Sequence, residues 1–428
     1  MKAPKIVYIG AGSMSFGIPT FQDIFSQPLL KRSTLCLVDI DEENLDRMHR
    51  LALKMNAVSG QELQIIATTE RREVLEGADF VINSLAIDRC ELWKQDFAVP
   101  RKYGIRHCLG ENGGPGALYF TMRTLPLILD IVHDMEELCP DAYFLNFSNP
   151  ETRLVLGVNM YTRIKCVGLC HGIFMAKDQI CDILGREDHN SIQLFGAGMN
   201  HFQWVTSIRD VETGEDLYPE FREKEAIYDP TFMPYLRKMF HVFGLYPTCS
   251  DDHFGEYQAY GYEAGEEGYN FAWDEQDRVR MKKEIEDVIS GREAADKWLS
   301  PSGERAVQLL VALHFNKQTV LPSAIVYNGG AIPQLPDDVA VEVPVVADAS
   351  GVHKLQVPEL PDAIIAMLNN QVSAQRMSVR AAFNGSKEMA YQALLVDPVI
   401  NSTIAAEKIN EELFALNAPY IHPCRASK

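Results

Sequence analysis

The stretch KIVYIGAGSMS, residues 5–15, decides the fold class of this chain. Its first five residues are almost entirely apolar, as expected of a strand buried on both faces of a parallel sheet. Gly10 and Gly12 follow at once, and Ser15 stands at the third position of the G-x-G-x-x-G/A pattern. The first glycine permits a tight turn, and the second lets the backbone approach a pyrophosphate at a helix N-terminus. We therefore expect a Rossmann-type dinucleotide site that includes Ser13 and Met14.

The end of the second predicted strand, residues 35–39, selects the nucleotide. Asp39 closes this strand, where a carboxylate accepts hydrogen bonds from ribose hydroxyls and repels the extra phosphate of NADP. The sequence thus predicts NAD, with Asn83 and Asn146 near it because each ends a further strand. The alternatives are a glycine turn that binds no cofactor and an Asp39 that only caps a helix or closes a turn.

Strands and helices alternate in the first half of the chain and predict a doubly wound α/β sheet. Strands are expected at residues 5–9, 35–39, 79–83 and 143–146, with helices at 42–58 and 121–137 between them. Beyond about residue 195 we expect helices at 278–289, 303–315, 363–383 and 386–395, and extended chain at 332–346. We therefore expect a Rossmann domain at 1–195 and an α+β domain at 196–428 for substrate, metal and oligomer contacts.

Composition excludes several classes of partner. The 428 residues are 46% hydrophobic, and 40 basic against 59 acidic residues give a net charge of −19. Such a chain has no general attraction to nucleic acid or anionic lipid. No apolar run reaches the roughly 18 residues that span a bilayer, and we find no signal peptide. With nine scattered cysteines, this pattern predicts a cytoplasmic protein with reduced thiols and a small-molecule substrate.

Four polar segments carry the candidate chemistry: residues 145–150, 167–172, 198–202 and 250–257. The first two follow predicted strands, at the edge of a parallel sheet where ligands collect. Cys170 and His201 could bind one metal, and two protein ligands would leave positions open for substrate oxygens. Residues of these types are more often a buried thiol and a core histidine, so spacing alone does not establish the site.

Taken in order, these segments resemble the signature motifs of glycoside hydrolase family 4. The resemblance runs from about residue 4 to residue 400. It includes the glycine turn, Asn146-x-x-Asn149-Pro150, Gly168-Leu-Cys170-His171, Asn200-His201-Phe202, Asp251-x-His253-x-x-Glu256-Tyr257, Gly110–Gly116 and Asn328–Ile332. Family members depart from the usual two-carboxylate mechanism of glycosidases and depend on NAD.

The resemblance implies a fold like that of lactate and malate dehydrogenases, and NAD as a cofactor. It further implies a divalent metal, usually Mn²⁺, bound by Cys170 and His201. Asn149 and Asn200 become candidates for substrate binding. Relatives are commonly homodimers or homotetramers.

The same resemblance implies an unusual hydrolysis. The sugar is oxidised at C3 by NAD, deprotonated at C2, cleaved by elimination, hydrated and reduced again. Asp251 matches the position of the base, and His171 matches the position where some relatives carry the acid. Asp252 and Tyr257 are the alternatives for the base.

Two departures from the family pattern concern the substrate. Many relatives have Arg-x-Gly-Gly after the strand that ends near Asn83, and in phosphosugar enzymes this arginine contacts the substrate. Here Ala86 stands in that region, and Cys170 is followed by His171 and Gly172, a triplet that resembles the α-uronidases. We therefore expect hydrolysis of an α-galacturonide or α-glucuronide.

A uronate carboxylate needs a cation or backbone donors. Arg89, Lys94 and the turn at Gly113 and Gly114 are the candidates, although both charges could also lie on a solvated helix face. The alternative functions are an α-galactosidase or α-glucosidase of the same family, an NAD-dependent dehydrogenase of a sugar or 2-hydroxy acid, and a non-catalytic redox sensor that binds NAD.

Overall fold

The glycine turn follows the central strand of a parallel sheet, as the sequence predicts. In a computed structural model that describes residues 2–425 and 427, the described strands form one 11-stranded sheet in the order β3-β2-β1-β4-β5-β6-β9-β10-β7-β8, with β11 beside β10. The first six of these strands run parallel. They are β1 (Lys5–Ile9), β2 (Thr34–Val38), β3 (Gln64–Thr68), β4 (Phe80–Asn83), β5 (Tyr143–Asn146) and β6 (Lys165–Gly168).

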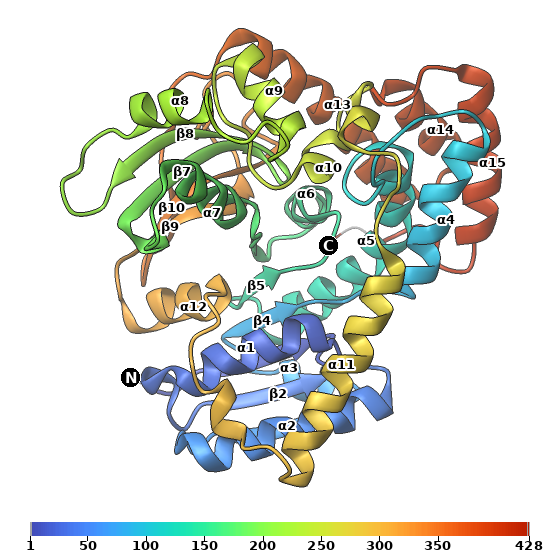
Figure 1. Cartoon of the computed structure of the whole chain (residues 1–428). Coiled ribbons are helices and arrows are strands. Elements are labelled where there is room, and N and C mark those ends of the chain that lie inside the picture. Colours follow the sequence, from blue (N-terminus) through green and yellow to red (C-terminus); the bar gives the residue numbers. More distant parts are fainter. Residues whose placement is uncertain (1, 426, 428) are drawn as a thin grey trace.

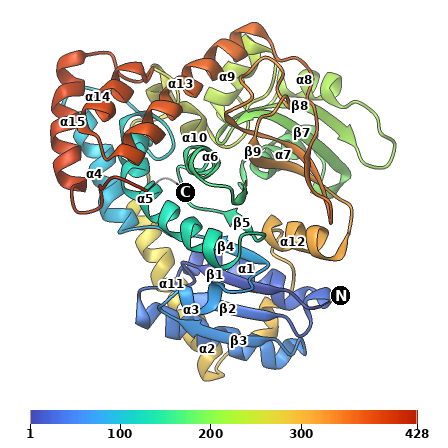
Figure 2. The same ribbon diagram turned by 180° about the vertical axis from the view of Figure 1, so that it is seen from behind.

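Alternate residues of β1 enter two separate cores, which explains why the strand is apolar throughout. Ile6 and Tyr8 pack with α1 (Met14–Ser26) and α2 (Glu42–Ser59) on one face of the sheet. Val7 and Ile9 pack on the other face. That face carries α3 (Arg72–Leu75), α5 (Gly114–Leu138) and α6 (Glu151–Tyr161). Helices cover both faces of the sheet (Figure 2), so the doubly wound α/β prediction is confirmed.

Antiparallel strands extend the sheet beyond β6. They are β9 (Thr319–Tyr327), β10 (Ala340–Asp348), β7 (Ile192–Met199), β8 (Phe202–Asp210) and β11 (Gly351–Lys354). The extended segment expected at 332–346 becomes a strand only from Ala340, because turns occupy most of the residues before it. The domain division expected after residue 195 lies within β7.

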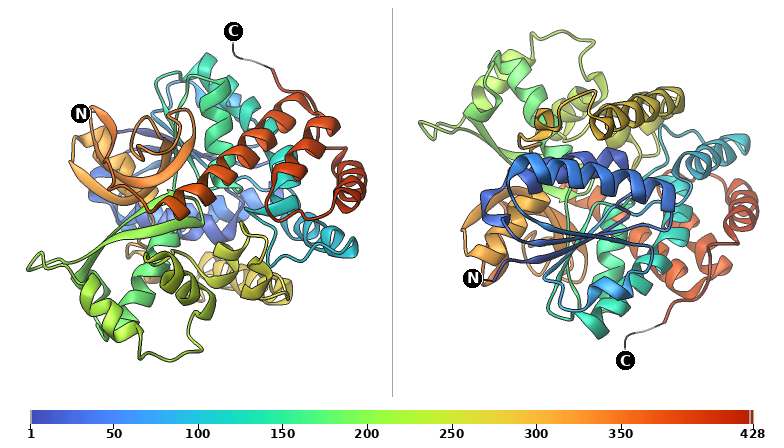
Figure 3. Two further views of the ribbon diagram at one scale, coloured as in Figure 1. Left: turned by 90° about the horizontal axis from the view of Figure 1, so that it is seen from above. Right: turned by 90° about the horizontal axis from the view of Figure 1, so that it is seen from below.

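Helices of the second half pack against the first half of the chain. The long α11 (Phe271–Ser290) lies along α1 and α2 (Figure 1), and α13 (Asp362–Asn384) packs on α5 and α6. The views along the vertical axis show α13, α14 and α15 together at one side of the molecule (Figure 3). The remaining helices are α4 (Arg89–Lys102), α7 (Gly172–Leu184), α8 (Tyr218–Glu225), α9 (Pro234–Phe243), α10 (Asp251–Gly255), α12 (Arg305–Phe315), α14 (Lys387–Val396) and α15 (Thr403–Asn417), with short 3-10 turns η1 (Pro28–Leu30), η2 (His189–Ser191), η3 (Gly261–Ala264) and η4 (Ala295–Trp298).

The helices of this fold are not of the membrane-spanning kind in the part of the chain that the structure describes. Over residues 2–425 and 427, none combines the length and the apolar character that crossing a bilayer requires.

Candidate active site

The glycine turn after β1 has the backbone geometry that a dinucleotide loop needs. Gly10 has φ +78°, and a Cβ there would lie 2.9 Å from the backbone of Ser84 and Leu85. A Cβ on Gly12 would lie 2.8 Å from the Asp39 carboxylate. Helix α1 begins just after this turn, and its N-cap Ser13 forms no side-chain capping hydrogen bond. The amides of the first turn of α1 are thus free of a side-chain cap, as an anion-binding helix end requires.

Asp39 is placed beside this turn by the end of β2. Its Oδ2 accepts a hydrogen bond from Gly12 N at 2.8 Å, and its Oδ1 accepts one from Asp41 N at 2.9 Å. The carboxylate therefore fixes the glycine turn against the neighbouring strand, and it stays at the position where a ribose would be recognised.

Two predicted cofactor residues meet at the ends of adjacent strands. Asn83 Nδ2 donates to Asn146 Oδ1 and to Ser148 Oγ, each at 2.9 Å. Asn146 Nδ2 in turn donates to the Ser148 backbone carbonyl at 2.8 Å. Because both amides are fully buried, the cluster holds the carboxyl edge of β4 and β5 rigid beside the glycine turn. Sequence reasoning missed Ser148, although it lies within the Asn146–Asn149 motif.

His201 lies at the tip of a tight hairpin. Strands β7 and β8 pair up to Met199 and Phe202, so Asn200 and His201 form a two-residue turn. His201 has φ +59°, a left-handed conformation in which non-glycine residues are uncommon. Asn200 is fully buried, and its backbone N–H donates to Thr152 Oγ1 at 3.0 Å. The hairpin thereby packs against α6 and presents the imidazole toward the carboxyl edge of the parallel strands.

Cys170 and His201 are brought together, as the metal-site prediction requires. The two side chains interact closely enough for each to shift the pKa of the other. A contact with Cys249 and burial raise the pKa of Cys170, and although burial opposes it, the neighbouring thiol raises the pKa of His201. His201 Nδ1 has no hydrogen-bond partner. Glu151 and Glu342 lie buried nearby. Burial raises the pKa of each carboxyl group, and the charge of His201 partly opposes this.

This donor pair fits a divalent transition metal, because thiolate and imidazole are soft and borderline ligands. Among the residues that the structure describes, no three His, Cys, Asp or Glu side chains form a metal cage. A metal held by Cys170 and His201 would therefore keep several coordination positions for oxygens from outside the chain.

Glu256 occupies a cradle of backbone amides beside His201. Its Oε2 accepts hydrogen bonds from the N–H groups of Glu111, Asn112 and Gly113 at 2.5, 2.7 and 3.2 Å. Its other oxygen, Oε1, has no hydrogen-bond partner and lies 3.9 Å from His201 Nδ1. The backbone donors considered for a substrate carboxylate at Gly113 thus already hold an internal carboxylate.

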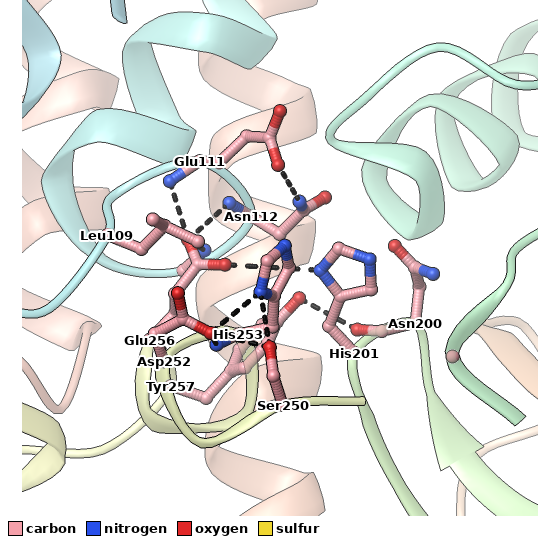
Figure 4. A network of polar contacts seen from close by, with 12 residues as sticks. Leu109, Glu111, Asn112, Asn200, His201, Ser250, Asp252, His253, Glu256 and Tyr257 are labelled. Atoms are coloured by element: carbon pink, nitrogen blue, oxygen red, sulfur yellow. Dashed lines mark hydrogen bonds and ion pairs between the residues drawn. The ribbon is translucent and has the colours of Figure 1, made fainter. Parts of the chain in front are cut away.

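The side chains of the acidic segment at 250–257 point in two directions, some toward α9 and some toward His201. Asp251 accepts hydrogen bonds from the backbone N–H groups of Tyr235 and Leu236 at 3.2 and 2.9 Å, in the first turn of α9. Asp252 binds His253 Nδ1 at 2.9 Å, and the His253 ring lies 4.8 Å from that of His201, edge to face (Figure 4). Tyr257 donates its hydroxyl to the Asn200 carbonyl at 2.8 Å. The predicted base Asp251 is therefore bound to α9, while Asp252 belongs to the cluster around His201.

His171, the predicted acid, begins α7 directly after Cys170. Its Nε2 lies 2.7 Å from Glu304 Oε1, and this hydrogen bond raises the pKa of His171 above its usual value. The ring is half-exposed. Asn149 is partly exposed in the turn before α6.

Gly172 lies between two thiols. A Cβ at this position would lie 2.4 Å from Cys249 Sγ and 3.8 Å from Cys170 Sγ. The backbone confirms the close approach, since Cys249 N donates to the Gly172 carbonyl at 3.2 Å. Cys249 therefore fills the space that a side chain at position 172 would occupy.

The two candidate cations near β4 differ in their surroundings. Arg89 lies beside Glu111 and Asp274, with Nη–O distances of 3.1 and 3.4 Å, and over the Trp93 ring. Lys94 pairs with Glu91 in an exposed position on the same helix, α4. Only Arg89 adjoins the loop that holds Glu256.

Comparison with known proteins identifies the family. Residues 5–186 match the model described as "Family 4 glycosyl hydrolase", and residues 196–400 match the model of its C-terminal domain. The chain belongs to glycosyl hydrolase family 4. An α-glucosidase from Erwinia rhapontici is 30% identical over 98% of the chain and 99% of its own length. An α-galactosidase from Bacillus subtilis is 29% identical over 97% and 99%, and an α-galacturonidase from Thermoanaerobacter italicus is 26% identical over 96% and 95%.

Solved structures agree with this family 4 fold. A 6-phospho-α-glucosidase from gut microorganisms, in complex with NAD and Mn²⁺, superposes with a TM-score of 0.82 at 20% identity, over 99% of this chain and all of the other. Malate dehydrogenase from Plasmodium falciparum superposes with a TM-score of 0.55 at 13% identity, over 89% and 98%. The expected likeness to malate dehydrogenase is confirmed at the level of fold.

Proposed function

We propose that this family 4 glycosidase hydrolyses α-linked uronic acid glycosides, an α-galacturonide or an α-glucuronide. We further propose that it holds NAD at the glycine turn and a divalent metal, Mn²⁺ by analogy with the relatives, at Cys170 and His201. The observation that carries the substrate class is the triplet Cys170-His171-Gly172, in which Cys249 fills the space that a side chain at position 172 would take.

The cofactor proposal rests on residues of this chain that fit both groups. Gly10 and Gly12 let the turn pack tightly against Ser84 and Asp39 ahead of the N-terminus of α1, the arrangement that binds a pyrophosphate in Rossmann folds, and Asp39 stands where a ribose would be bound. When bound, NAD would exchange hydride with the sugar ring, and the metal would polarise sugar oxygens as a Lewis acid. Asn200 and Asn149 remain the candidates for orienting the sugar, since Asn200 Oδ1 is buried without a hydrogen-bond partner beside His201.

Arg89 is our candidate for recognising the uronate carboxylate. Its guanidinium adjoins Glu111, next to the loop around Glu256, whereas Lys94 points to a surface pair with Glu91. Both terminal nitrogens of Arg89 already face carboxylates, so the substrate would share the cation with Glu111 or Asp274. A bidentate arginine–carboxylate contact is strong and directional, which suits discrimination against a hydroxymethyl group.

Two groups compete for the role of base. Asp251, the residue that the family resemblance favours, is bound by the amides of α9. Asp252 forms a dyad with His253, and that imidazole contacts the ring of His201. Comparing Asp251→Asn with Asp252→Asn separates them, because the variant that loses the base should lose at least a hundredfold in kcat.

The substrate class is tested by measuring kcat/KM for nitrophenyl α-galacturonide, α-glucuronide, α-galactoside and α-glucoside with NAD, Mn²⁺ and a thiol reductant. We expect the best uronide to exceed both neutral hexosides by at least about a hundredfold, because a neutral sugar leaves the site's cation unpaired. A neutral hexoside cleaved as well as the best uronide would overturn the uronidase proposal.

A matched pair of variants tests Arg89. Arg89→Met should lower kcat/KM for the uronide at least about a hundredfold and change that for a hexoside little. Lys94→Met, on the same helix, should change neither. Equal losses on both substrates would assign Arg89 to structure instead.

The NAD proposal has its own measurement. Dialysed enzyme should be inactive until NAD is added, and no NADH should accumulate with product, because the cofactor is regenerated in each turnover. Stoichiometric NADH would favour the sugar dehydrogenase instead.

A neutral α-hexosidase is the second candidate function. It is favoured by the 30% and 29% identity to an α-glucosidase and an α-galactosidase, both higher than the 26% identity to the α-galacturonidase. The four-substrate comparison decides between the two.

A further inference from the structure

A second cavity lies between α7 and α12, outside the site around His201. It has a volume of about 240 Å³, and residues of these two helices and of β7 and β9 line it. We call it the α7–α12 groove. Its polar lining consists of Lys177, Asn190, Gln193, Arg305 and Gln308, and Phe174 provides an aromatic wall.

Two cations of the groove have no carboxylate partner. Within residues 2–425 and 427, no Asp or Glu oxygen lies within 4.0 Å of the Lys177 ammonium or the Arg305 guanidinium. Arg305 Nη1 donates to Gln308 Oε1 at 3.0 Å, and its guanidinium lies 4.2 Å from the Phe174 ring centroid. Arg305 Nε is buried without a hydrogen-bond partner. In a chain of net charge −19, two unpaired cations in one cavity are unusual.

The nearest carboxylates are already engaged elsewhere. Glu304 pairs with His171, and Asp23 accepts two hydrogen bonds from Ser302. On the other side, Asp178 pairs with His189, and Asp188 accepts from Asn190 N.

The two cations also repel each other. Burial lowers the pKa of Lys177, the Arg305 charge lowers it further, and Asp178 and Asp188 only partly oppose this. Burial likewise lowers the pKa of Arg305, against Asp23 and Glu304. Like charges that face one cavity destabilise the empty groove and favour an anion between them.

The size and the lining define the ligand. A cavity of about 240 Å³ is smaller than the roughly 300–1,000 Å³ of cofactor and drug sites, so it suits a single small ring. The amides of Gln193, Gln308 and Asn190 match hydroxyl groups, while the cations match a carboxylate or phosphate.

Neither Cys170 nor His201 lines the groove. Its β7 residues lie at the Ile192 end of that strand, whereas Phe174 and Lys177 lie on α7 within two turns of Cys170. Arg305 directly follows Glu304, the partner of His171.

We propose that the α7–α12 groove binds an anionic monosaccharide, a sugar acid or a sugar phosphate, at a site separate from Cys170 and His201. The proposal does not depend on which glycoside the enzyme cleaves.

Isothermal titration of the full-length protein with D-galacturonate and with glucose 6-phosphate tests it, with D-galactose and D-glucose as neutral controls. Each single variant, Lys177→Met and Arg305→Met, should weaken binding of at least one anion about tenfold or more, and the double variant about a hundredfold. Lys54→Met, an exposed lysine of α2, is the matched control and should bind as the wild type does. Weaker binding of both anions in the variants indicates a general anion site. Weaker binding of only one anion identifies the carboxylate or the phosphate as the group that the groove recognises.

Galacturonate bound as a product at the Cys170–His201 site is distinguished by the same titrations, because that binding persists in the double variant. Unchanged binding of both anions in the double variant would overturn the proposal, as would absence of anion binding to the wild type.

The thermal unfolding temperature, Tm, tests the charge argument without ligand and the binding argument with it. Lys177→Met should raise Tm in the absence of anion, because it removes one of two repelling, desolvated charges. The anion should raise Tm of the wild type and not of the double variant. A lower Tm for Lys177→Met without ligand would contradict the charge argument.

Discussion

The glycine turn after β1 and the cluster around His201 lie at the same edge of the sheet but differ in how far their polar groups are hydrogen-bonded. At the glycine turn most of these polar atoms bind one another, as Asp39 does with Gly12 and Asn83 Nδ2 does with Asn146, while Asn83 Oδ1 is buried without a partner. Around His201 several buried polar atoms have no partner, including His201 Nδ1 and Glu256 Oε1. The first region is closed mainly by contacts of its own backbone, whereas the second gathers several buried side-chain atoms that form no hydrogen bond.

This difference teaches how the two regions should respond to mutation. The glycine turn should be sensitive to added atoms, because its close packing depends on the absence of side chains at its glycines. If the buried groups without partners bind a ligand, as we propose, they should be sensitive to removed charges.

The largest expected effect comes from removing a side chain that we propose as a metal ligand. Cys170→Ser and His201→Asn should each lower kcat by at least about a thousandfold while NAD affinity stays within a few fold, since neither residue contacts the glycine turn. Asparagine tolerates the left-handed backbone of His201 better than alanine does. Activity with added Mn²⁺ and NAD binding by titration are the measurements, and Cys424→Ser controls for loss of a thiol. Near-normal turnover in either variant would show that its residue is not a ligand.

The second effect concerns the carboxylate in the amide cradle. Glu256→Gln should lower kcat by about ten- to a hundredfold, as is typical for partners that orient a metal ligand. Glu225→Gln is the control, because Glu225 is equally buried but binds Arg237 and His241 away from His201. If both variants lost stability alike and neither changed kcat, Glu256 would act only in holding its loop.

The third effect tests the other side of the comparison. Gly12→Ala should raise the Kd for NAD about tenfold or more and leave kcat at saturating NAD little changed, because the new Cβ would press on the Asp39 carboxylate. Gly60→Ala adds a methyl group in open space at φ +67°, and it should lower stability by about 1 kcal/mol without changing NAD affinity. An NAD affinity that did not change in Gly12→Ala would remove the glycine turn from the cofactor site.

The smallest effect at neutral pH involves His107, which packs under Gly110 of the cradle loop. Burial lowers the pKa of His107 to about 4, below the usual value of about 6.5 for an unfolded chain. Between these two values the unfolded chain binds a proton that the folded protein does not, so stability falls as pH falls. From pH 7.5 to pH 5 this group should cost about 2 kcal/mol of unfolding free energy. Urea unfolding of wild type and His107→Gln at both pH values measures it, and equal pH dependence would show that His107 is not the group involved.

Local sequence patterns predicted the strand and turn of the glycine site, but they predicted only some of the residues that gather around His201. Residues 5–12 specify their own strand and turn, because the apolar run and the two glycines act within a few residues of one another. The metal pair depends on residues 31 positions apart, and it was found through the family resemblance rather than through spacing. The cradle of Glu256 escaped prediction because it joins backbone amides at 111–113 to a side chain that is far away in the chain.

Neighbouring residues show why a list of polar side chains is not a site. Asp251 and Asp252 are adjacent in sequence, yet α10 turns them in different directions, one to α9 and one to His253. The sequence indicated that residues 250–257 are unusually polar, but it could not show which of their side chains point toward His201. The pairings β6–β9 and β10–β7 were equally out of reach, because each joins strands more than a hundred residues apart in the sequence.

Gly172 and Cys249 are separate in sequence but linked in the substitutions they permit. Any side chain at position 172 would meet Cys249 Sγ at 2.4 Å, so Gly172→Ser should be poorly tolerated while Cys249 is present. After Cys249→Ala the same change should cost much less, which a double-mutant cycle in unfolding free energy would reveal. During evolution, a replacement of Gly172 would then be tolerated only after Cys249 had been replaced. This contact therefore restricts the order in which the two mutations can occur, and not only which residues are allowed.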